Sequence, residues 1–314
     1  MDTYVLGVDA GGSHTRALLA NLTGVPVAAG RAGGANPVSR GVDGALVELR
    51  RAVGAAVGGI DPAAVAVCVV GIAGGPTLGR PFRVALDQMA ADLGLRRGCT
   101  LVSDTEIGFA AGTSADHGIL VLAGTGAAVA EIRAGRLTRH VDGYGWLLGD
   151  DGSGFWLGRE AVRAALAELD GRGAATALTG RVAAALGVEP AVDPLVAAVY
   201  ASPPVQLARL APQVTAAAEG GDAVAAELLE RAAGHLLRAV AVLDPRDHRQ
   251  AVLTGGVLLA RGVIADLVVA GLRDRFGLAS AFGVNGAAGA AALALRLLTG
   301  RPVPPDVHAR LTAD

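Results

Sequence analysis

The sequence predicts an α/β protein made of two related halves, each with a sheet flanked by helices. The length of 314 residues corresponds to about two domains. Short apolar, β-branched segments alternate with longer segments of helical spacing, as in α/β proteins. A strand, a glycine turn and a second strand occur at Gly11-Gly12 and again at Gly124–Gly126. This repetition indicates two related halves that face one another.

The first half is expected to contain three consecutive strands, then helix, strand, helix and strand. Residues 3–10 are apolar and β-branched, as buried strands are. Thr23-Gly24 is a tight turn signal, so the next two strands form a hairpin. The expected elements are strands at 3–10, 15–22 and 25–29, a helix at 41–58, a strand at 64–73, a helix at 80–94, a strand at 100–103 and a helix near 105–112.

The second half repeats the opening strands and then becomes mainly helical. Strands are expected at 117–123, 127–133, 137–140 and 251–253, helices across 152–243 with breaks near Gly171, Gly187, Pro203 and Gly220, and further helices at 262–274 and about 286–299. The tail after Gly300 holds three prolines and is expected to be loose. We place the domains at 1–115 and 116–314; periodicity leaves open whether the last helix packs back on the first domain.

The amino-acid composition limits which binding partners and which cellular location are expected for the protein. Hydrophobic residues make up 52% and aromatic residues 3%, so the core must be built from Ala, Val and Leu. The formal net charge is −2, which gives no electrostatic reason to expect nucleic acid or an acidic membrane as a partner. The apolar runs at 62–79 and 276–295 are interrupted by glycines and are interpreted as buried elements. No secretory signal is recognisable, and a cytoplasmic location is expected.

The chain contains no lysine, and this absence excludes several chemistries. A P-loop and the protein-kinase strand both need a lysine beside the phosphates. Schiff-base chemistry needs a lysine amine. The two cysteines, Cys68 and Cys99, cannot form a four-thiolate metal site, and we expect them to be buried thiols in a reducing compartment.

Four glycine turns are candidates for binding phosphate through backbone N–H groups. Glycine lets an anion approach the backbone without obstruction by a side chain. The turns are Gly11-Gly12, Gly74-Gly75, Gly124-Thr125-Gly126 and Gly255-Gly256. Any one of them alone is compatible with a simple hairpin. Two such hairpins at equivalent places in two halves predict a clamp for a triphosphate.

Two carboxylates follow predicted strands in the first half. Asp9 ends the first strand beside a glycine turn, where a carboxylate can hold hydrated Mg²⁺ near phosphates. Asp104 ends the strand at 100–103, where a carboxylate can orient and deprotonate an attacking hydroxyl. The structural alternatives are that Asp9 caps its turn and that Asp104 is the N-cap of the following helix.

Aromatic and acidic residues are concentrated at 142–156, which includes both tryptophans. Mixtures of carboxylates and rings bind sugars, because carboxylates accept hydroxyl hydrogen bonds and rings cover apolar sugar faces. The alternative is a helix beginning at Gly152, with Asp150, Asp151 and Ser153 as caps. We assign Phe155 and Trp156 to the core and Asp150 to function.

Six segments follow one another in order along most of the chain: GVDAGGSHTRALLAN (7–21), VSDTEIGFAAGT (102–113), LVLAGTGAAVAEI (120–132), GYGWLLGDDGSGFWLGRE (143–160), LTGGV (253–257) and GAAGAA (286–291). Taken together, these segments resemble the BadF/BadG/BcrA/BcrD ATPase family and, within it, the N-acetylglucosamine kinases. The resemblance implies a two-domain actin-like ATPase (ribonuclease H-like) fold, with a duplicated mixed sheet flanked by helices and an interdomain cleft.

The resemblance also implies roles for individual residues. Asp104 would be the catalytic base. Asp9 would provide the Mg²⁺ environment. The residues matching the nucleotide motifs are Asp9, Gly11, Gly12, Ser13, Thr15, Gly124, Thr125, Gly126, Gly255 and Gly256. The residues expected at the sugar are Asn36, Gly75, Asp104, Thr105, Tyr144, Gly145, Trp146 and Asp150.

The aromatic segment departs from the family pattern. Family members often read Gly-Trp-Gly ahead of Gly-Asp-Glu-Gly, whereas this chain reads Gly143-Tyr144-Gly145-Trp146 and has Asp151 in place of Glu. The ring that covers the sugar is therefore Tyr144 or Trp146, and selectivity for the acetyl group stays open.

The expected activity is an ATP- and Mg²⁺-dependent transfer of the γ-phosphoryl group to the 6-hydroxyl of N-acetylglucosamine by a homodimer. Alternatives are a glucosamine or N-acetylmuramic acid kinase, an ATPase that activates a reductase through an iron–sulfur cluster, and a non-catalytic sugar or nucleotide sensor. The second alternative needs cysteine ligands at a subunit contact, and Cys68 and Cys99 lie in predicted strands.

Overall fold

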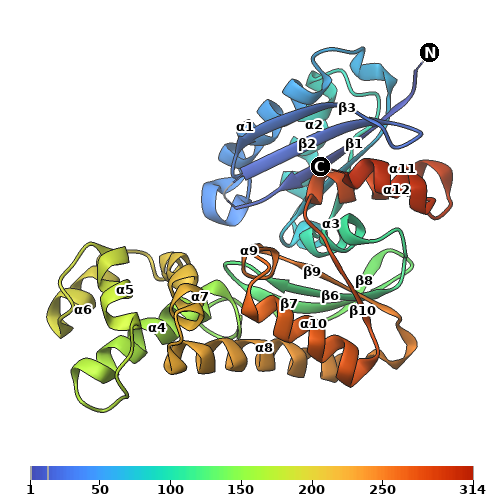
Figure 1. Ribbon diagram of the computed structural model, residues 1–314. Coiled ribbons are helices and arrows are strands. Elements are labelled where there is room, and N and C mark those ends of the chain that lie inside the picture. The colour runs from blue at the N-terminus through green and yellow to red at the C-terminus, as the bar shows by residue number, and fades with distance from the viewer. Residues whose placement is uncertain (1, 13, 314) are drawn as a thin grey trace. The chain divides into compact units, whose positions relative to one another are not determined.

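The computed structural model describes residues 2–12 and 14–313 and divides the chain into two compact units. The first unit comprises Met1–Gly118, Ile132–Thr138 and Ala281–Asp314, and the second comprises Ile119–Glu131 and Arg139–Ser280. Figure 1 shows strands flanked by helices in both units.

The first unit is built on a five-stranded sheet with the order β3-β2-β1-β4-β5. Its strands are β1 (Tyr4–Ala10), β2 (His14–Asn21), β3 (Pro26–Gly33), β4 (Val65–Ile72) and β5 (Cys99–Val102). β1 pairs antiparallel with β2 and parallel with β4, and β4 pairs parallel with β5. The carboxyl ends of β1, β4 and β5 therefore lie at one edge of the sheet.

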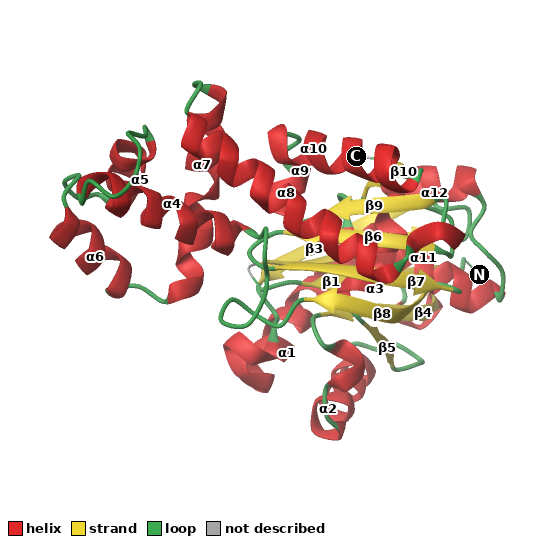
Figure 2. Cartoon of the chain, turned by 90° about the horizontal axis from the view of Figure 1, so that it is seen from below, coloured by secondary structure: helices red, strands yellow, loops and turns green. Residues whose placement is uncertain are grey.

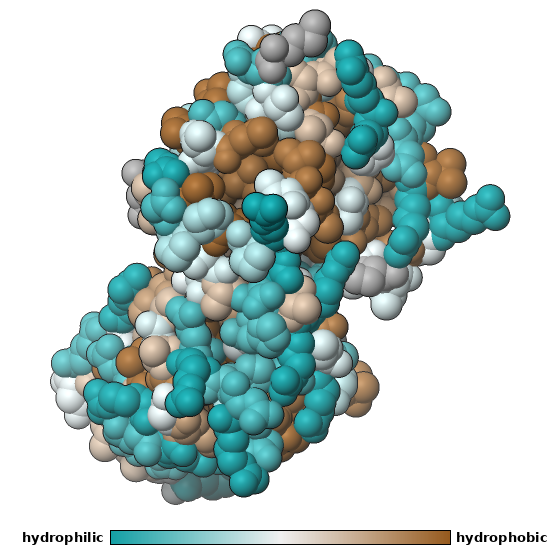
Figure 3. All heavy atoms as spheres, turned by 90° about the vertical axis from the view of Figure 1, so that its right-hand side faces the viewer, coloured by the Kyte–Doolittle hydropathy of each residue, from teal (hydrophilic) through white to brown (hydrophobic). Residues whose placement is uncertain are grey.

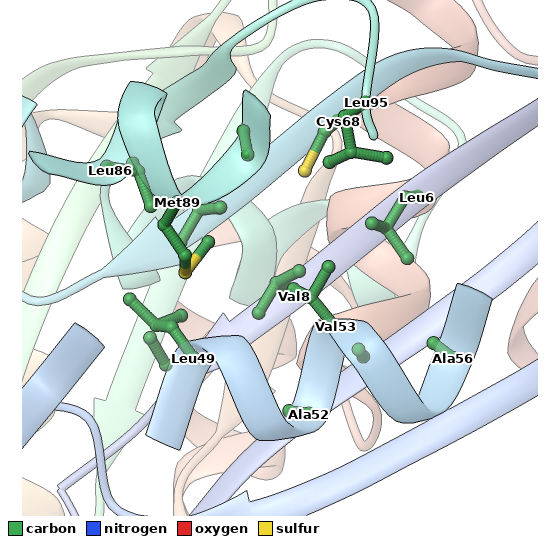
Figure 4. Packing of buried hydrophobic residues seen from close by; sticks show 14 of the residues in the cluster. Leu6, Val8, Leu49, Ala52, Val53, Ala56, Cys68, Leu86, Met89 and Leu95 are labelled. Atoms are coloured by element: carbon green, nitrogen blue, oxygen red, sulfur yellow. The ribbon is translucent and has the colours of Figure 1, made fainter. Parts of the chain in front are cut away.

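Helices cover both faces of this first sheet. They are α1 (Pro37–Val57), α2 (Arg80–Asp92), α3 (Asp104–Gly112), α11 (Gly286–Thr299) and α12 (Pro305–Thr312), with short 3-10 turns η1 (Pro62–Ala64) and η2 (Gly75–Thr77). On one face, Leu49 and Val53 of α1 and Met89 of α2 pack with Leu6 and Val8 of β1 (Figure 4). The other face carries α3 and the alanine-rich α11.

Small residues let α11 approach the first sheet closely. A Cβ atom on Gly7 of β1 would lie 2.2 Å from the backbone nitrogen of Ala291, and one on Gly289 would lie 2.0 Å from the carbonyl oxygen of Ile107. Glycine at both positions is therefore required for the contacts of α11 with β1 and α3. The last long helix belongs to the first unit.

The second sheet has the order β10-β9-β6-β7-β8, which repeats the connectivity of the first sheet. Its strands are β6 (Gly118–Ala123), β7 (Ala127–Arg133), β8 (Arg136–Asp142), β9 (Gln250–Thr254) and β10 (Ala279–Phe282). β6 and β9 pair in parallel, as β1 and β4 do. The predicted α/β class with a duplicated mixed sheet is confirmed.

The second unit is rich in helices (Figure 2). They are α4 (Gly154–Leu169), α5 (Leu178–Leu186), α6 (Val192–Tyr200), α7 (Ala211–Glu219), α8 (Ala223–Leu243), α9 (Gly256–Leu259) and α10 (Val263–Phe276), with 3-10 turns η3 (Pro204–Leu210) and η4 (Pro245–Asp247). The predicted breaks near Gly171, Gly187, Pro203 and Gly220 all fall between these helices. Glycine and proline mark these ends because they disfavour continued helix.

The prediction of a loose tail after Gly300 is wrong. Pro305 is the first residue of α12, where its fixed φ and missing N–H suit a helix start. Buried His308 and Leu311 dock this helix, and the His308 ring nitrogen Nε2 lies 2.7 Å from the carbonyl oxygen of Ala110 in α3. The strand β10 was also not predicted, because its four residues are too short for a periodic signal.

Polar residues dominate much of the surface, but Figure 3 also shows a broad apolar area on one face of the first unit. Leu22, Val25 and Leu297 are among the exposed apolar side chains of this unit. Within the described part of the chain, no helix has the length and apolar character needed to span a bilayer.

Candidate active site

Three predicted functional segments follow the parallel strands of the first sheet. Asp9 lies at the carboxyl end of β1, Gly74-Gly75 follow β4, and Asp104 follows β5. Because β4 pairs in parallel with both β1 and β5, these segments share one edge of the sheet. The topology thus brings together residues that are far apart in the sequence.

Asp9 is a half-buried carboxylate in an unfavourable electrostatic environment. Burial raises its pKa from 3.8 to about 6, Arg16 opposes this shift, and the charge of Asp104 adds to it. A Cβ atom on Gly286, the first residue of α11, would lie 2.5 Å from Oδ2 of Asp9. The missing side chain at Gly286 therefore makes room for this carboxylate.

Asp104 is not the N-cap of α3, contrary to the structural alternative. Ser103 is the N-cap, and its Oγ accepts a hydrogen bond from the backbone nitrogen of Glu106 at 3.1 Å. The Glu106 carboxylate accepts in return from the Ser103 backbone nitrogen at 2.7 Å, which completes a capping box. Asp104 therefore lies at the first helical position and is not part of the capping box, although its Oδ1 accepts from the backbone nitrogen of Thr105.

The surroundings of Asp104 suit a proton acceptor. Its Oδ1 accepts hydrogen bonds from the backbone nitrogen and the hydroxyl of Thr105, at 3.0 and 3.4 Å. Burial raises the pKa of Asp104, and the hydrogen bonds from Thr105 act in the opposite direction. A raised carboxyl pKa makes Asp104 a stronger base than a free aspartate.

The first glycine turn is held by backbone hydrogen bonds and remains open on one side. The Gly11 nitrogen donates to the carbonyl of His14 at 3.0 Å, and the Gly11 carbonyl accepts from Ala35 at 2.9 Å. The second bond keeps the residue before Asn36 beside the turn. Gly12 is exposed, and a Cβ atom there would meet nothing within 4 Å. Ser13 lies outside the described residues.

Two further predicted residues of the first unit have identifiable structural partners. Thr15 is buried, and its hydroxyl donates to the carbonyl of Gly33 at 2.7 Å, which ties β2 to β3 beside the turn. A Cβ atom on Gly75 would lie 2.3 Å from the carbonyl oxygen of Val102. Only glycine permits this approach of Gly75 to the end of β5, two residues before Asp104.

In the second unit, the two predicted nucleotide turns lie side by side. β6 pairs with β9, so the turn at Gly124–Gly126 and the turn at Gly255-Gly256 follow neighbouring parallel strands. Gly255 has a φ of +90°, and a Cβ atom there would lie 2.4 Å from the carbonyl oxygen of Ala123. Thr125 and Gly256 are exposed.

The start of α4 is anchored to the first of these turns. The backbone nitrogens of Gly154 and Phe155 donate to the carbonyls of Gly124 and Thr125, at 2.7 and 3.2 Å. The N-cap of α4 is Ser153, whose Oγ accepts from the Trp156 nitrogen at 3.1 Å, so the cap does not involve Asp150 or Asp151.

The segment between β8 and α4, residues 143–153, is called the aromatic loop below. The side chain of Tyr144 is 63% exposed, whereas that of Trp146 is 40% exposed and packs on buried Phe155 with ring centroids 5.5 Å apart. Phe155 and Trp156 are buried, in agreement with their assignment to the core. The structure therefore leaves both Tyr144 and Trp146 accessible.

Asp150 joins the aromatic loop to the neighbouring glycine turn. Its Oδ2 lies 2.6 Å from the position of a Cβ atom on Gly126. Burial raises the pKa of Asp150, backbone hydrogen bonds from Ala127 and Gly145 lower it, and the charge of Asp142 raises it. Asp150 therefore accepts backbone hydrogen bonds from both segments.

Sequence reasoning did not assign roles to Glu106, Gly286 or Asp142. Glu106 was detectable, because Ser-x-x-Glu before an apolar segment is the signature of a capping box. The approach of Gly286 to Asp9 joins residues almost a whole chain apart, so no local signal could reveal it.

The donor set at Asp9 fits a magnesium ion. Carboxylate oxygens are the ligands that Mg²⁺ prefers, and a cation would relieve the repulsion between Asp9 and Asp104. The described residues contain no cluster of three or more His, Cys, Asp or Glu suited to a metal.

Comparison with known proteins yields a family and several relatives. The model of the BadF/BadG/BcrA/BcrD ATPase family matches residues 6–294. An N-acetylmuramic acid/N-acetylglucosamine kinase from Clostridium acetobutylicum is 30% identical over 266 residues, which cover 81% of this chain and 85% of the relative.

Solved structures with the same fold include a protein from Chromobacterium violaceum with a provisional assignment as an N-acetylglucosamine kinase. It is 29% identical, with a TM-score of 0.74, and the match covers 94% of this chain and 99% of that one. A glucokinase of the ROK family from Streptomyces griseus, in complex with glucose and AMPPNP, is 19% identical with a TM-score of 0.57, covering 93% and 99% of the two chains. The second likeness establishes the fold alone.

Proposed function

The chain belongs to the BadF/BadG/BcrA/BcrD ATPase family, and from this we propose that it is an ATP-dependent amino-sugar kinase. The proposed reaction transfers the γ-phosphoryl group of ATP to the 6-hydroxyl of N-acetylglucosamine. The name of the relative from Clostridium acetobutylicum supports an amino-sugar acceptor. We further propose that the protein works as a cytoplasmic homodimer.

The observation that carries the proposal is the position of Asp104. Ser103 and Glu106 form the capping box of α3, and the hydrogen bonds from Thr105 engage Oδ1 of Asp104, so its Oδ2 is the oxygen proposed for the chemistry. Its pKa is raised by burial, and its charge acts on Asp9. In the proposed reaction Asp104 accepts the proton of the sugar hydroxyl, whose oxygen forms a bond to the γ-phosphorus. The bond to the bridging oxygen breaks, and ADP leaves with that electron pair.

The remaining residues bind and orient the reactants. We propose that Asp9 holds Mg²⁺, which when bound offsets negative charge on the phosphates. The backbone N–H groups around Gly11, Gly12, Ser13, Gly124, Thr125 and Gly126 would contact phosphates, and Gly255 and Gly256 would approach the adenosine. Thr15 would act indirectly, since its hydroxyl is engaged by Gly33.

We assign the sugar to the residues near Asp104 and to the aromatic loop. The candidate contacts are Asn36, Gly75, Thr105, Tyr144, Gly145, Trp146 and Asp150. The exposure of Tyr144 favours it as the ring over the sugar, because Trp146 already packs on Phe155. A second acceptor, N-acetylmuramic acid, is favoured by the name of the relative from Clostridium acetobutylicum.

An ADP-release assay over a panel of sugars tests the proposal. The panel contains N-acetylglucosamine, N-acetylmuramic acid, glucosamine and glucose, each with and without Mg²⁺. We expect Mg²⁺-dependent release of ADP with N-acetylglucosamine, and a product phosphorylated on the 6-oxygen. Release of ADP that is independent of every sugar would contradict the kinase proposal. Sedimentation of the purified protein tests the homodimer.

A further inference from the structure

Asp142, the last residue of β8, makes an unusual set of hydrogen bonds with the aromatic loop. Its Oδ1 accepts from the backbone nitrogens of Gly143 and Asp150, each at 2.8 Å. Its Oδ2 accepts from the backbone nitrogen of Asp151 at 2.9 Å. One side chain therefore joins the two ends of the loop.

The backbone of the loop is shaped around this carboxylate. Asp142 and Asp150 both have positive φ angles, of 64° and 60°, which non-glycine residues seldom adopt. A Cβ atom on Gly149 would lie 2.0 Å from Oδ1 of Asp142, so only glycine permits the approach of the carboxylate. The hydrogen bonds to Asp142 offset the strain at these positions.

Side-chain packing contributes little to the shape of the loop. Leu147 and Leu148 at its tip are 73% and 79% exposed, and Tyr144 is exposed as well. Trp146 is the loop residue that packs on a buried ring. Oδ2 of Asp151 also lies 3.4 Å from Nδ1 of His235. Hydrogen bonds to a charged acceptor are stronger than those between neutral groups, so the three bonds to Asp142 are a substantial constraint on the loop.

We propose that Asp142 is a positioning residue that holds the aromatic loop in its sugar-binding shape. It acts through Asp150: it fixes the backbone of Asp150, whose own carboxylate accepts from Ala127 and Gly145. Loss of Asp142 releases both ends of the loop and, with them, the side chains of Tyr144 and Asp150. The effect of Asp142 on sugar binding rests on the proposed function, whereas its effect on the order of the loop does not.

Limited proteolysis with chymotrypsin measures loop order without any assay of activity. The loop contains aromatic and leucine cleavage sites at Tyr144, Trp146, Leu147 and Leu148. Tyr200 at the end of α6 is 86% exposed and serves as a control site in the same molecule. We expect cleavage at 144–148 to accelerate about tenfold in D142A, with cleavage at Tyr200 unchanged.

D142N provides a graded test. Its amide keeps one oxygen for Gly143 and Asp150 and loses the bond to Asp151, so its cleavage rate should fall between those of the wild type and D142A. In the kinase assay, KM for the amino sugar should rise about tenfold in D142A and less in D142N, with a smaller change in KM for ATP. D274N, at an exposed aspartate of α10 that pairs with Arg273, is the control.

The outcomes separate the two proposals. Equal cleavage of the loop in the wild type and D142A would overturn the role of Asp142. Faster cleavage of D142A both in the loop and at Tyr200 would also overturn it, because that pattern reports global unfolding. Faster loop cleavage with an unchanged KM for sugar would overturn the positioning of sugar contacts. If the wild type phosphorylates no amino sugar yet D142A is cut faster in the loop alone, the proposed function fails and the loop-holding role of Asp142 stands.

Discussion

Burial raises the pKa of Asp9 and the charge of Asp104 adds a smaller contribution, so the carboxylates from β1 and from the start of α3 lie within electrostatic range of each other. Both side chains are half-buried. Two anions held together in this way are unfavourable without a cation or a proton. Perturbed carboxylates of this kind are typical of catalytic sites and support the assignment of this edge of the first sheet.

Asn in place of Asp104 removes the proposed base and keeps the shape of the side chain. We expect D104N to lower kcat for sugar phosphorylation about a thousandfold, because a general base contributes roughly that factor. ATP binding, measured by calorimetry, should be preserved. D274N should retain full activity, and a D104N enzyme with near-normal turnover would remove Asp104 from the mechanism.

The raised pKa of Asp9 has a consequence for stability. Folded Asp9 binds its proton more tightly than the unfolded chain does, so its contribution to stability is present below pH 3.8 and is lost as the pH rises through about 6. D9N stays neutral at every pH. In the absence of ATP and Mg²⁺, we expect D9N to unfold about 2–4 °C higher than the wild type at neutral pH and above.

The same variant should lose Mg²⁺-dependent kinase activity. Its stability advantage over the wild type should shrink as the pH falls towards 4, where Asp9 is protonated. Thermal unfolding across this pH range measures the difference. A D9N protein that unfolds at a lower temperature than the wild type at neutral pH would show that the Asp9 charge does not destabilise the fold.

Gly255 is expected to tolerate no side chain. Alanine there would combine a φ of +90° with a Cβ atom 2.4 Å from the Ala123 carbonyl, displacing the turn at Gly255-Gly256 from its neighbour at Gly124. We expect G255A to weaken ATP binding at least about tenfold, or about 1.4 kcal/mol. G171A is the matched control, because Gly171 has a φ of +73° and no atom within 4 Å of an added Cβ. Equal effects of the two variants on ATP affinity would argue against a nucleotide role.

Cys68 and Cys99 are directly paired across β4 and β5, with their sulfur atoms 3.1 Å apart. Oxidation by diamide should therefore join them, as the two thiols lose two hydrogens to the oxidant. Mass spectrometry should show the loss of two hydrogens and a peptide linking residues 68 and 99. C99S should give no such link. Two thiols that both remain free after oxidation of the folded protein would contradict the register of β4 and β5.

Most elements of the fold could be predicted because their signals are local. Buried parallel strands read as short apolar runs, and glycine and proline mark the ends of helices. The two related halves could be predicted because the opening strands recur along the chain, whereas the strand order of the sheets could not. Sequence patterns do not predict α12, because several prolines in a short segment usually indicate a loop, although proline at the first helical position favours a helix.

The sequence predicted which residues are candidates for the site, but it predicted few of the contacts that these residues make. Asp104 looked equally suited to a cap and to a base, since aspartate favours both positions. The capping box of Ser103 and Glu106 excludes Asp104 as the N-cap, and its spacing was present in the sequence. The hydrogen bonds that Asp142 accepts from the backbone nitrogens of Asp150 and Asp151 could not be predicted, because the flexible glycines between these residues allow many loop conformations.

The sequence by itself determined the alternation of strands and helices, the position of the glycine turns and the exclusion of reactions that need a lysine. These features follow from hydrophobic periodicity, from the conformational freedom of glycine and from which residue types are present, and all three can be seen without the folded structure. Only the tertiary structure decided that Gly286 meets Asp9, that Gly255 meets Ala123 and that Asp104 acts on the pKa of Asp9. These contacts join segments far apart in the chain, and their geometry is set by strand pairing and close packing within each unit.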